Sequence, residues 1–175
     1  MDKKILITGA PGTGKTSIIN HLKKLGYSCS MEISRKIITE QIASDGEILP
    51  WKNLEAFSQR VFSLRKAQYI NAPSDTMHFF DRGIIDVIAY MKVDNLTISE
   101  NYKEDCEKYK YNTTVFYTPI WEVIYQTDTQ RKEDIESAIA IEKSLLETYK
   151  SFGYMLIEIP KLTTSERVDF ILSKI

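Results

Sequence analysis

The stretch GAPGTGKT at residues 9–16 combines glycines, a lysine and a threonine at the spacing Gly-x-x-x-x-Gly-Lys-Thr. Glycines let consecutive backbone N–H groups turn toward one point, where they cradle phosphate oxygens. At this spacing Lys15 reaches the β- and γ-phosphates of a nucleoside triphosphate, and the Thr16 hydroxyl is a ligand for Mg²⁺. An apolar run precedes the motif and a helical pattern follows it, which argues against a chance glycine-rich turn. The sequence therefore predicts a nucleotide site formed by Gly9, Ala10, Pro11, Gly12, Thr13, Gly14, Lys15, Thr16 and Ser17.

A second chemical pair is Asp81 and Arg82, which follow the apolar end of the segment HFFD. A carboxylate at the end of a strand beside the phosphate motif holds the water shell of the metal, so we predict Asp81 as a metal-site residue together with Thr16. Large motor ATPases carry a second acid at the next position to activate water, whereas an arginine grips an acceptor or a phosphate. Arg82 is therefore predicted to bind substrate, the alternative being a surface turn that caps a helix. The Asn-Lys-x-Asp motif of switch GTPases is absent, so we expect ATP and keep GTP as an open alternative.

Glu32 and Arg35 follow the second strand-like segment. Ligands gather at the carboxyl ends of parallel strands, so we expect Glu32 to face the same cleft as Lys15 and Asp81. A carboxylate there accepts the proton of an attacking hydroxyl, and an arginine one helical turn later holds an anionic substrate. Both are predicted substrate-binding residues, and either Glu32 or Asp81 is the base. The alternative for Glu32 is a charge that complements the positive end of the next helix.

The polar segment TDTQRKED, residues 127–134, contains Arg131 and Lys132. A loop at this point closes over the phosphates, places a cation on the transferring group and excludes water. We predict Arg131 as a catalytic residue, and a solvated loop that leads into a helix is the alternative. Residues 160–164, which follow the last strand, are a candidate shelf for the nucleotide base.

Composition favours one globular domain spanning residues 1–175, with 23 Lys or Arg and 24 Asp or Glu. A chain of this size buries roughly 70% of its unfolded surface. The net charge of -1 gives no bulk attraction to nucleic acid or to an anionic membrane. Cys29 and Cys106 fit no metal or redox spacing, and no run approaches the ~20 apolar residues of a membrane helix. We therefore expect a cytoplasmic protein without membrane insertion, and the composition leaves its oligomeric state open.

Hydrophobic periodicity predicts strands that alternate with helices, and this alternation indicates an α/β fold with a parallel sheet covered on both faces. The expected strands are residues 3–8, 27–31, 77–80 (ending at Asp81), 113–117 and 154–159. The expected helices are residues 15–25, with Ile18, Ile19, Leu22 and Leu25 on one face, then 32–43, 51–72, 84–91 and 133–152, and a last helix from a capping box of Thr163 with Glu166. Residues 94–112 are a charged, tyrosine-rich excursion with one short helix.

With these residues in view, the chain resembles the small P-loop AAA-type domains grouped with the ribosylnicotinamide kinase domain of NadR regulators. The segments that carry the resemblance are GAPGTGKT, MEISRKIITEQ, FFDRGIIDVIAY, YQTDTQRKE and YMLIEIPKLTTSERVDFIL. It also resembles thymidylate and deoxynucleoside kinases, which pair an acid after strand two with an acid and an arginine after strand three. The resemblance implies a three-layer P-loop fold with strand order 2-3-1-4-5, a nucleoside triphosphate and Mg²⁺. The chain departs from these kinases in its single loop arginine and in lacking a substrate fingerprint.

Two functions follow from these features. The first is a phosphotransferase that moves the γ-phosphate of ATP to a small nucleoside- or nucleotide-like acceptor, held near the long helix where Trp51, Phe57 and Gln59 are candidates to contact a base. The second is a nucleotide-dependent switch or weak NTPase that acts on a protein or lipid, with Tyr102, Tyr109 and Tyr111 as a candidate interaction surface. No residue dedicated to activating water is visible in the sequence, which favours the kinase.

Overall fold

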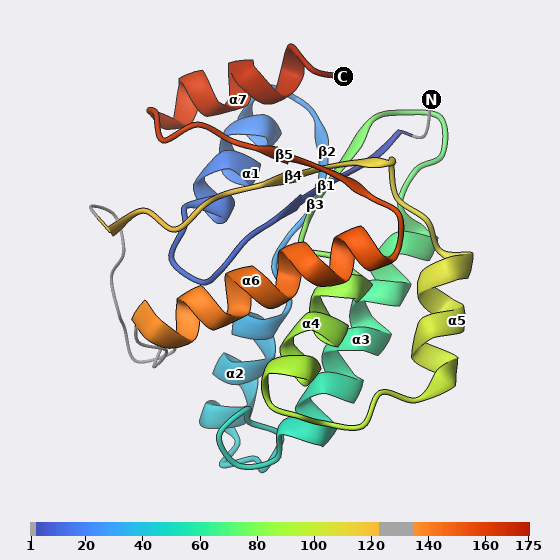
Figure 1. Ribbon diagram of the computed structural model, residues 1–175. Coiled ribbons are helices and arrows are strands. Elements are labelled where there is room, and N and C mark those ends of the chain that lie inside the picture. Colours follow the sequence, from blue (N-terminus) through green and yellow to red (C-terminus); the bar gives the residue numbers. More distant parts are fainter. Residues whose placement is uncertain (1–2, 123–134) are drawn as a thin grey trace.

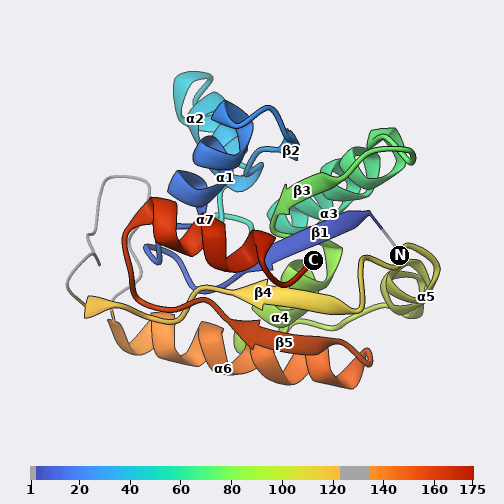
Figure 2. The ribbon, with the colours of Figure 1, turned by 90° about the horizontal axis from the view of Figure 1, so that it is seen from above.

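Five parallel strands form one sheet in the order β2-β3-β1-β4-β5, and helices cover both of its faces (Figures 1 and 2). This computed structural model describes residues 3–122 and 135–175. The strands are β1 Lys4–Thr8, β2 Ser28–Ser30, β3 His78–Asp81, β4 Thr114–Tyr117 and β5 Met155–Glu158. The helices are α1 Lys15–Lys24, α2 Ser34–Ala43, α3 Leu54–Asn71, α4 Ile84–Val93, α5 Glu100–Lys108, α6 Ile135–Ser151 and α7 Thr164–Leu172. The predicted α/β class and strand order are confirmed.

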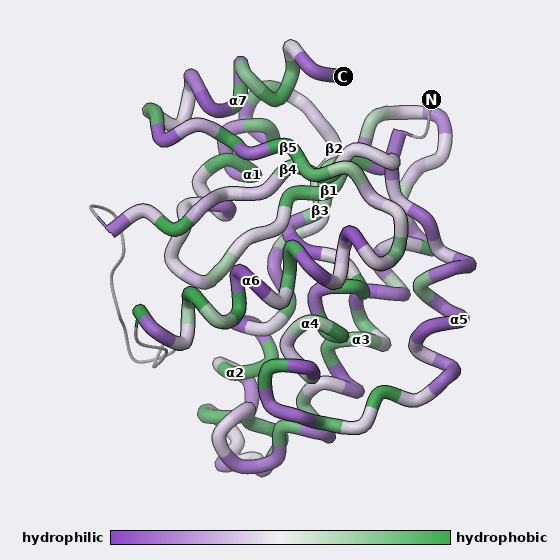
Figure 3. Tube along the Cα trace, viewed as in Figure 1, coloured by the Kyte–Doolittle hydropathy of each residue, from purple (hydrophilic) through white to green (hydrophobic). Residues whose placement is uncertain are grey.

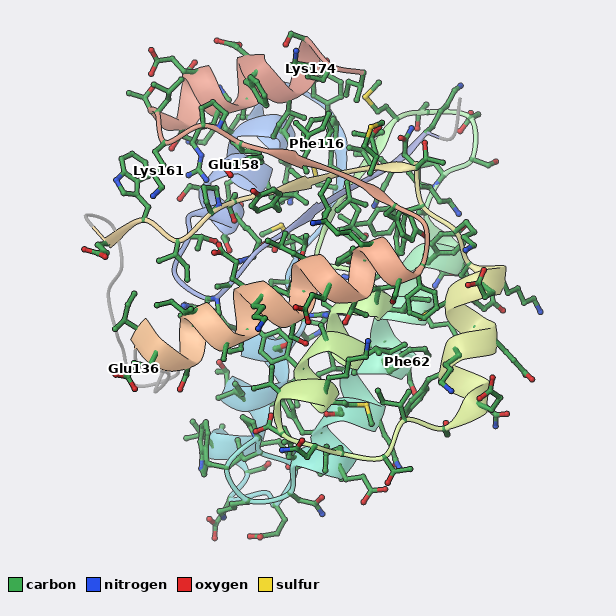
Figure 4. All side chains as sticks on the ribbon, in the orientation of Figure 1. Phe62, Phe116, Glu136, Glu158, Lys161 and Lys174 are labelled. Atoms are coloured by element: carbon green, nitrogen blue, oxygen red, sulfur yellow. The ribbon has the colours of Figure 1, made fainter. Side chains whose placement is uncertain are left out.

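The central strand β1 separates two hydrophobic cores. Ile5 and Ile7 pack with residues of α1 and α7, whereas Leu6 packs with residues of α3, α4 and α6. Because β1 is buried on both faces, its sequence is a continuous apolar run instead of an alternating one. Figure 4 marks the two cores by Phe116 on the α1 and α7 side and Phe62 on the other side. The helices are thereby fixed against a rigid sheet whose carboxyl edge carries the predicted site.

Three details differ from the sequence prediction. Leu25 is 53% exposed, because α1 ends at Lys24 and Gly26, with φ of 91°, turns the chain away from the core. Helix α3 begins at Leu54, since the Asn53 side chain accepts a hydrogen bond from the Ala56 N–H at 3.0 Å and caps the helix there. Helix α2 begins at Ser34 and not at Glu32. The capping box that starts α7 is confirmed.

The tyrosine-rich excursion contains the expected short helix, α5, which Figure 3 shows as a largely hydrophilic segment at the side of the molecule. Its tyrosines nevertheless point inward. Tyr102 packs on Phe62 with ring centroids 4.3 Å apart, Tyr109 packs on Tyr69, and Tyr111 is buried. Tyr111 is thus excluded from the expected interaction surface, whereas Tyr102 and Tyr109 pack on the core and keep only part of each ring exposed. Within the described ranges, no helix combines the length and the apolar character needed to cross a bilayer.

Candidate active site

A cavity of about 900 Å³ opens at the carboxyl edge of the sheet. Residues 11–17 form one wall, and α2, α3, α4, α6 and the start of α7 supply the others. The cavity brings together these predicted residues: Lys15, Thr16, Glu32, Arg35, Asp81, Arg82, Trp51 and Phe57. Residues from Pro11 to Arg167 thus surround one space large enough for a nucleotide and a small second molecule.

The loop between β1 and α1 has the conformation that its glycines predict. Gly9, Gly12 and Gly14 have φ of 141°, 80° and 84°, values that side chains disfavour. A Cβ on Gly9 would also lie 2.5 Å from the Thr118 carbonyl oxygen, so only glycine fits there. Gly9 and Ala10 do not line the cavity, although they were predicted to bind the nucleotide. Both residues instead turn their carbonyl groups toward the Lys15 ammonium.

Lys15 is buried at the base of the cavity. Its Nζ donates to the Gly9 carbonyl at 2.9 Å and to the Ala10 carbonyl at 2.6 Å. Burial, followed by repulsion from Arg82, lowers the pKa of its ammonium group well below the ordinary value, and the Asp81 carboxylate opposes this. Among the described residues, the hydrogen-bond partners of this ammonium are neutral, and a phosphate would supply an anionic one.

Thr16 and Asp81 form the candidate metal site. The Thr16 hydroxyl donates to Asp81 Oδ2 at 3.2 Å, and Asp81 is only 1% exposed. Its other oxygen, Oδ1, is buried and has no hydrogen-bond partner among the described residues. Burial raises the pKa of Asp81, and the attraction of Lys15 and Arg82 offsets this only in part. These are hard oxygen donors beside a phosphate loop, a donor set that fits Mg²⁺.

Arg82 follows β3 in a strained conformation, with φ of 71°. Its Nη1 donates to Asp86 Oδ1 at 3.2 Å, and its guanidinium lies 5.3 Å from the Tyr90 ring centre. Burial opposes ionisation, but Tyr90 and Asp86 outweigh it and raise the pKa of Arg82. The arginine therefore remains charged at the cavity wall and is not part of an exposed turn.

Asp86 holds this arginine, and sequence reasoning missed it. The buried carboxylate also accepts from the Thr8 hydroxyl at 2.7 Å, from the Gly83 N–H at 2.8 Å and from the Tyr149 hydroxyl at 2.5 Å. The sequence contained a signal, since Asp86 is the single acid in the apolar run at residues 84–89. A buried carboxylate with four donors from several elements fixes the position of each of them.

Glu32 lines the cavity and also caps α2. Its two carboxylate oxygens accept from the Ser34 N–H at 3.0 Å and the Arg35 N–H at 2.9 Å. Burial raises the pKa of Glu32, but Arg65, Arg82 and these N–H groups outweigh it and lower the pKa to about 2. The predicted alternative, a carboxylate at the positive end of a helix, is therefore present in the structure. A group this acidic is a weak proton acceptor at neutral pH.

Arg65 of α3 is a second residue that sequence reasoning missed. Its Nη2 donates to Glu32 Oε1 at 3.2 Å and its Nη1 to the Gly83 carbonyl at 3.0 Å, so it joins the ends of β2 and β3. The sequence did contain an indication of this role. Arg65 follows Phe57 and Val61 at a spacing of four residues, which places it on the buried face of the same helix.

Three remaining candidates have different outcomes. Arg35 lines the cavity from the first turn of α2, with an exposed side chain. Gln59 is exposed and does not line the cavity, so its predicted contact with a base is wrong; it lies on the outer face of α3. Arg131 and its neighbour Lys132 lie outside the described residues. Leu162, Thr163 and Thr164 line the cavity next to the phosphate loop, where a base shelf was expected.

A family model described as an AAA domain matches residues 4–167. The chain belongs to this family. No curated protein matches it. Deoxyadenosine kinase from M. mycoides with bound dCTP superposes with a TM-score of 0.68 at 21% identity, over 98% of this chain and 97% of that chain.

Two further structures share the fold. NadR protein in complex with NR has a TM-score of 0.70 at 15% identity, and the match covers 98% of this chain but 51% of NadR. Shikimate kinase from Acinetobacter baumannii in complex with shikimate has a TM-score of 0.58 at 16% identity, covering 98% and 91% of the two chains. These likenesses establish the P-loop kinase fold implied by the resemblance.

Proposed function

We propose that this protein is a Mg²⁺-dependent phosphotransferase that moves the γ-phosphate of ATP to the hydroxyl of a small nucleoside- or nucleotide-like acceptor. The observation that carries the proposal is the placement of Glu32 and Arg82 in the same cavity as Lys15 and Asp81. A hydrolase needs only the phosphate side of such a cavity, whereas a kinase also needs charged groups that hold a second substrate. Kinases acting on deoxyadenosine, thymidylate and shikimate share the fold, which supports the same reaction class.

On the nucleotide side, the backbone of residues 12–16 and the Lys15 ammonium bind the β- and γ-phosphates. Thr16 and Asp81 would hold Mg²⁺, which neutralises charge on the transferring group. Arg131 keeps its predicted role at that group. Because Asp81 Oδ1 has no hydrogen-bond partner among the residues that the structure describes, a cation there would satisfy a buried oxygen.

On the acceptor side, Glu32 acts as a fixed hydrogen-bond acceptor that orients the attacking hydroxyl. With a pKa of about 2 it stays ionised, and it is positioned by Arg65 and by the first turn of α2. Arg82 is held by Asp86 and stabilises charge that develops between the two substrates. Orientation of this kind accounts for a large share of phosphoryl-transfer catalysis.

The acceptor side of the cavity favours a molecule with a flat apolar ring. Leu54, Phe57 and Val61 of α3 line it, and Val87 and Tyr90 of α4 do so as well. Ser58 is buried on the same face of α3 and also lines the cavity. Apolar walls with a buried hydroxyl suit a heterocyclic base better than a charged acid.

A ligand screen followed by a transfer assay tests the proposal. Nucleosides, nucleoside monophosphates, nicotinamide riboside and shikimate are screened by thermal shift, with and without a non-hydrolysable ATP analogue. At least one nucleoside or nucleotide should stabilise the protein, and it should then accept ³²P from γ-labelled ATP only when Mg²⁺ or Mn²⁺ is present. Transfer that continues at full rate in EDTA would contradict the metal site, and ATP hydrolysis without any acceptor would favour a weak NTPase. We also propose a cytoplasmic location, because both Cys29 and Cys106 are free thiols.

A further inference from the structure

Arg167 of α7 reaches the phosphate loop from outside the motif. The side chain is 4% exposed, and its Nη2 donates to the Thr13 carbonyl at 3.0 Å. Its Nε is buried without a hydrogen-bond partner among the described residues, and Arg167 lines the same cavity as Lys15. Within the described ranges this buried arginine makes one hydrogen bond, which is costly to the fold, and neither the sequence motif nor the proposed catalytic roles use it.

Thr13 is held from a second side by the residue after β4. Its hydroxyl lies 2.5 Å from the Thr118 hydroxyl, and it also donates to the Ala10 carbonyl at 2.9 Å. Thr118 is itself fixed by its N–H, which donates to the Thr8 carbonyl at 2.9 Å. Arg167 of α7 thus holds the Thr13 carbonyl at the tip of the loop, and Thr118, which follows β4, holds the Thr13 hydroxyl.

The hydrogen bond from Arg167 to the Thr13 carbonyl also fixes the direction of the Gly14 N–H. A trans peptide is planar, so its carbonyl and its N–H point in opposite directions. With the Thr13 oxygen held toward Arg167, the Gly14 N–H points away from α7. Gly14 adopts φ of 84° and ψ of 15°, one of several conformations that a glycine enters at little cost, so the hydrogen bonds of Thr13 select it among the alternatives.

We infer that Arg167 is a positioning residue of the phosphate site: together with Thr118 it holds the tip of the loop so that the Gly14 N–H is already directed at the β-phosphate before the nucleotide binds. The inference rests on the proposed nucleotide site but not on the identity of the acceptor. Preorganised donors of this kind avoid the reorganisation that a flexible loop undergoes on binding. Affinity for the polyphosphate part of the nucleotide should therefore depend on Arg167, whereas contacts with the base should not.

The test compares two probes that share only the phosphates: a non-hydrolysable ATP analogue and inorganic tripolyphosphate, each with Mg²⁺. Arg167→Met should weaken both probes to the same degree, by roughly ten- to hundredfold, because a charge-assisted hydrogen bond is lost. Arg167→Lys keeps one donor and should recover part of the affinity. Thr118→Val removes the hydrogen bond to the Thr13 hydroxyl but keeps the one to the Thr13 carbonyl, and it should weaken both probes by roughly two- to tenfold. Arg60→Met is the matched control, since Arg60 is exposed on α3 and does not line the cavity.

Three outcomes decide the inference. Equal loss for both probes, with rescue by lysine, supports it. Unchanged affinity together with a lower melting temperature would show that Arg167 only docks α7, and loss of the ATP analogue alone would show that it contacts the base; either result overturns the inference. A wild-type protein that binds neither probe would instead overturn the nucleotide site itself, and with it the proposed function.

Discussion

At the scale of residues, the two cavity carboxylates are set apart by their surroundings. Asp81 is buried, one of its oxygens has no hydrogen-bond partner in the described part of the chain, and burial raises its pKa. Burial acts on Glu32 in the same direction, but two arginines and two N–H groups outweigh it and lower its pKa to about 2. Environments that shift the pKa values of two neighbouring carboxyl groups in opposite directions give the two groups different roles. Asp81 is suited to gain a cation, and Glu32 to remain a fixed anion.

The buried ammonium of Lys15 gives the most direct residue-scale prediction. Lys15→Ala should weaken binding of the ATP analogue at least tenfold and lower phosphate transfer by roughly 10²-fold or more, because the charge aimed at the phosphates is lost. Isothermal titration and a transfer assay measure the two effects. Lys36→Ala, which changes an exposed lysine on α2 that pairs with Glu40, is the control and should change neither. Wild-type affinity in Lys15→Ala would remove the basis for the nucleotide site.

The depressed pKa of Glu32 predicts how stability depends on pH. In the unfolded chain the carboxyl group titrates near 4.5, and in the folded protein near 2. The unfolded state therefore binds a proton first as the pH falls, so the contribution of Glu32 is complete above about pH 4.5 and is lost between pH 4.5 and 2. The shift corresponds to about 3 kcal/mol. Urea unfolding from pH 6 to 2.5 measures it, and Glu32→Gln should flatten that part of the curve. Parallel curves for the two proteins would show that Arg65 and the α2 N–H groups do not lower the pKa of Glu32.

At the scale of elements, the site is built from the junctions where strands end and helices begin. The β1–α1 junction carries the proposed phosphate loop, the β2–α2 junction carries Glu32, and the β3–α4 junction carries Asp81 and Arg82. Gly83 shows how tightly the last junction is packed: a Cβ there would clash with the Leu6 side chain and lie 3.0 Å from the Tyr111 ring. The strained Arg82 before it leaves the chain little freedom to adjust.

Gly83→Ala is therefore expected to destabilise the protein by about 1–3 kcal/mol through overpacking. Its N–H must also stay within reach of Asp86, so the change should disturb Arg82 as well. Gly26→Ala is the matched comparison, because a Cβ at Gly26 meets nothing within 4 Å and only its φ of 91° resists a side chain. Chemical unfolding separates the two effects: both variants lose stability, but only Gly83→Ala should also lower phosphate transfer. Full activity in Gly83→Ala would show that the junction tolerates expansion.

Local patterns made the elements predictable. The apolar run of β1, the glycine that ends α1 and the capping box of α7 each specify their structure within a few residues, and all three were confirmed. The starts of α2 and α3 were placed early, because Glu32 and Asn53 act as caps just before the helices and periodicity does not distinguish a cap from a first turn. The strand order came from the resemblance, since alternation of elements predicts a parallel sheet but not its order.

At the scale of the whole molecule, the cavity joins residues that are far apart in the chain. Lys15, Glu32 and Asp81 were predictable because they follow strands, and parallel strands end at one edge of the sheet. Arg65, Asp86 and Arg167 lie within helices, where a charged residue usually faces solvent. Their roles depend on how α3, α4 and α7 pack on the sheet, which the periodicity of one helix does not reveal. The sequence therefore predicted the centre of the site and missed the groups that hold it in place.

The division of the cavity into a nucleotide side and an acceptor side yields the last prediction. Asp81→Asn should lower both phosphate transfer and background ATP hydrolysis, because metal positioning serves either nucleophile. Glu32→Gln should leave affinity for the ATP analogue nearly intact, since Glu32 bonds to α2 and Arg65 and to none of the described phosphate-loop residues. Transfer to the acceptor found in the screen should fall by roughly 10²-fold or more, through loss of the oriented anion, while hydrolysis changes much less.

Measuring both activities in both variants separates the kinase from the switch. A transfer-to-hydrolysis ratio that falls only in Glu32→Gln is the result expected of a kinase, because only the acceptor reaction uses that side of the cavity. The melting temperature of Glu32→Gln at pH 7 controls for the lost cap of α2, and Glu40→Gln, an exposed acid on the same helix, controls for the charge change. An equal fall of both activities in Glu32→Gln would mean that Glu32 acts on water or on the nucleotide. The nucleotide-dependent switch would then replace the kinase as the better account of this cavity.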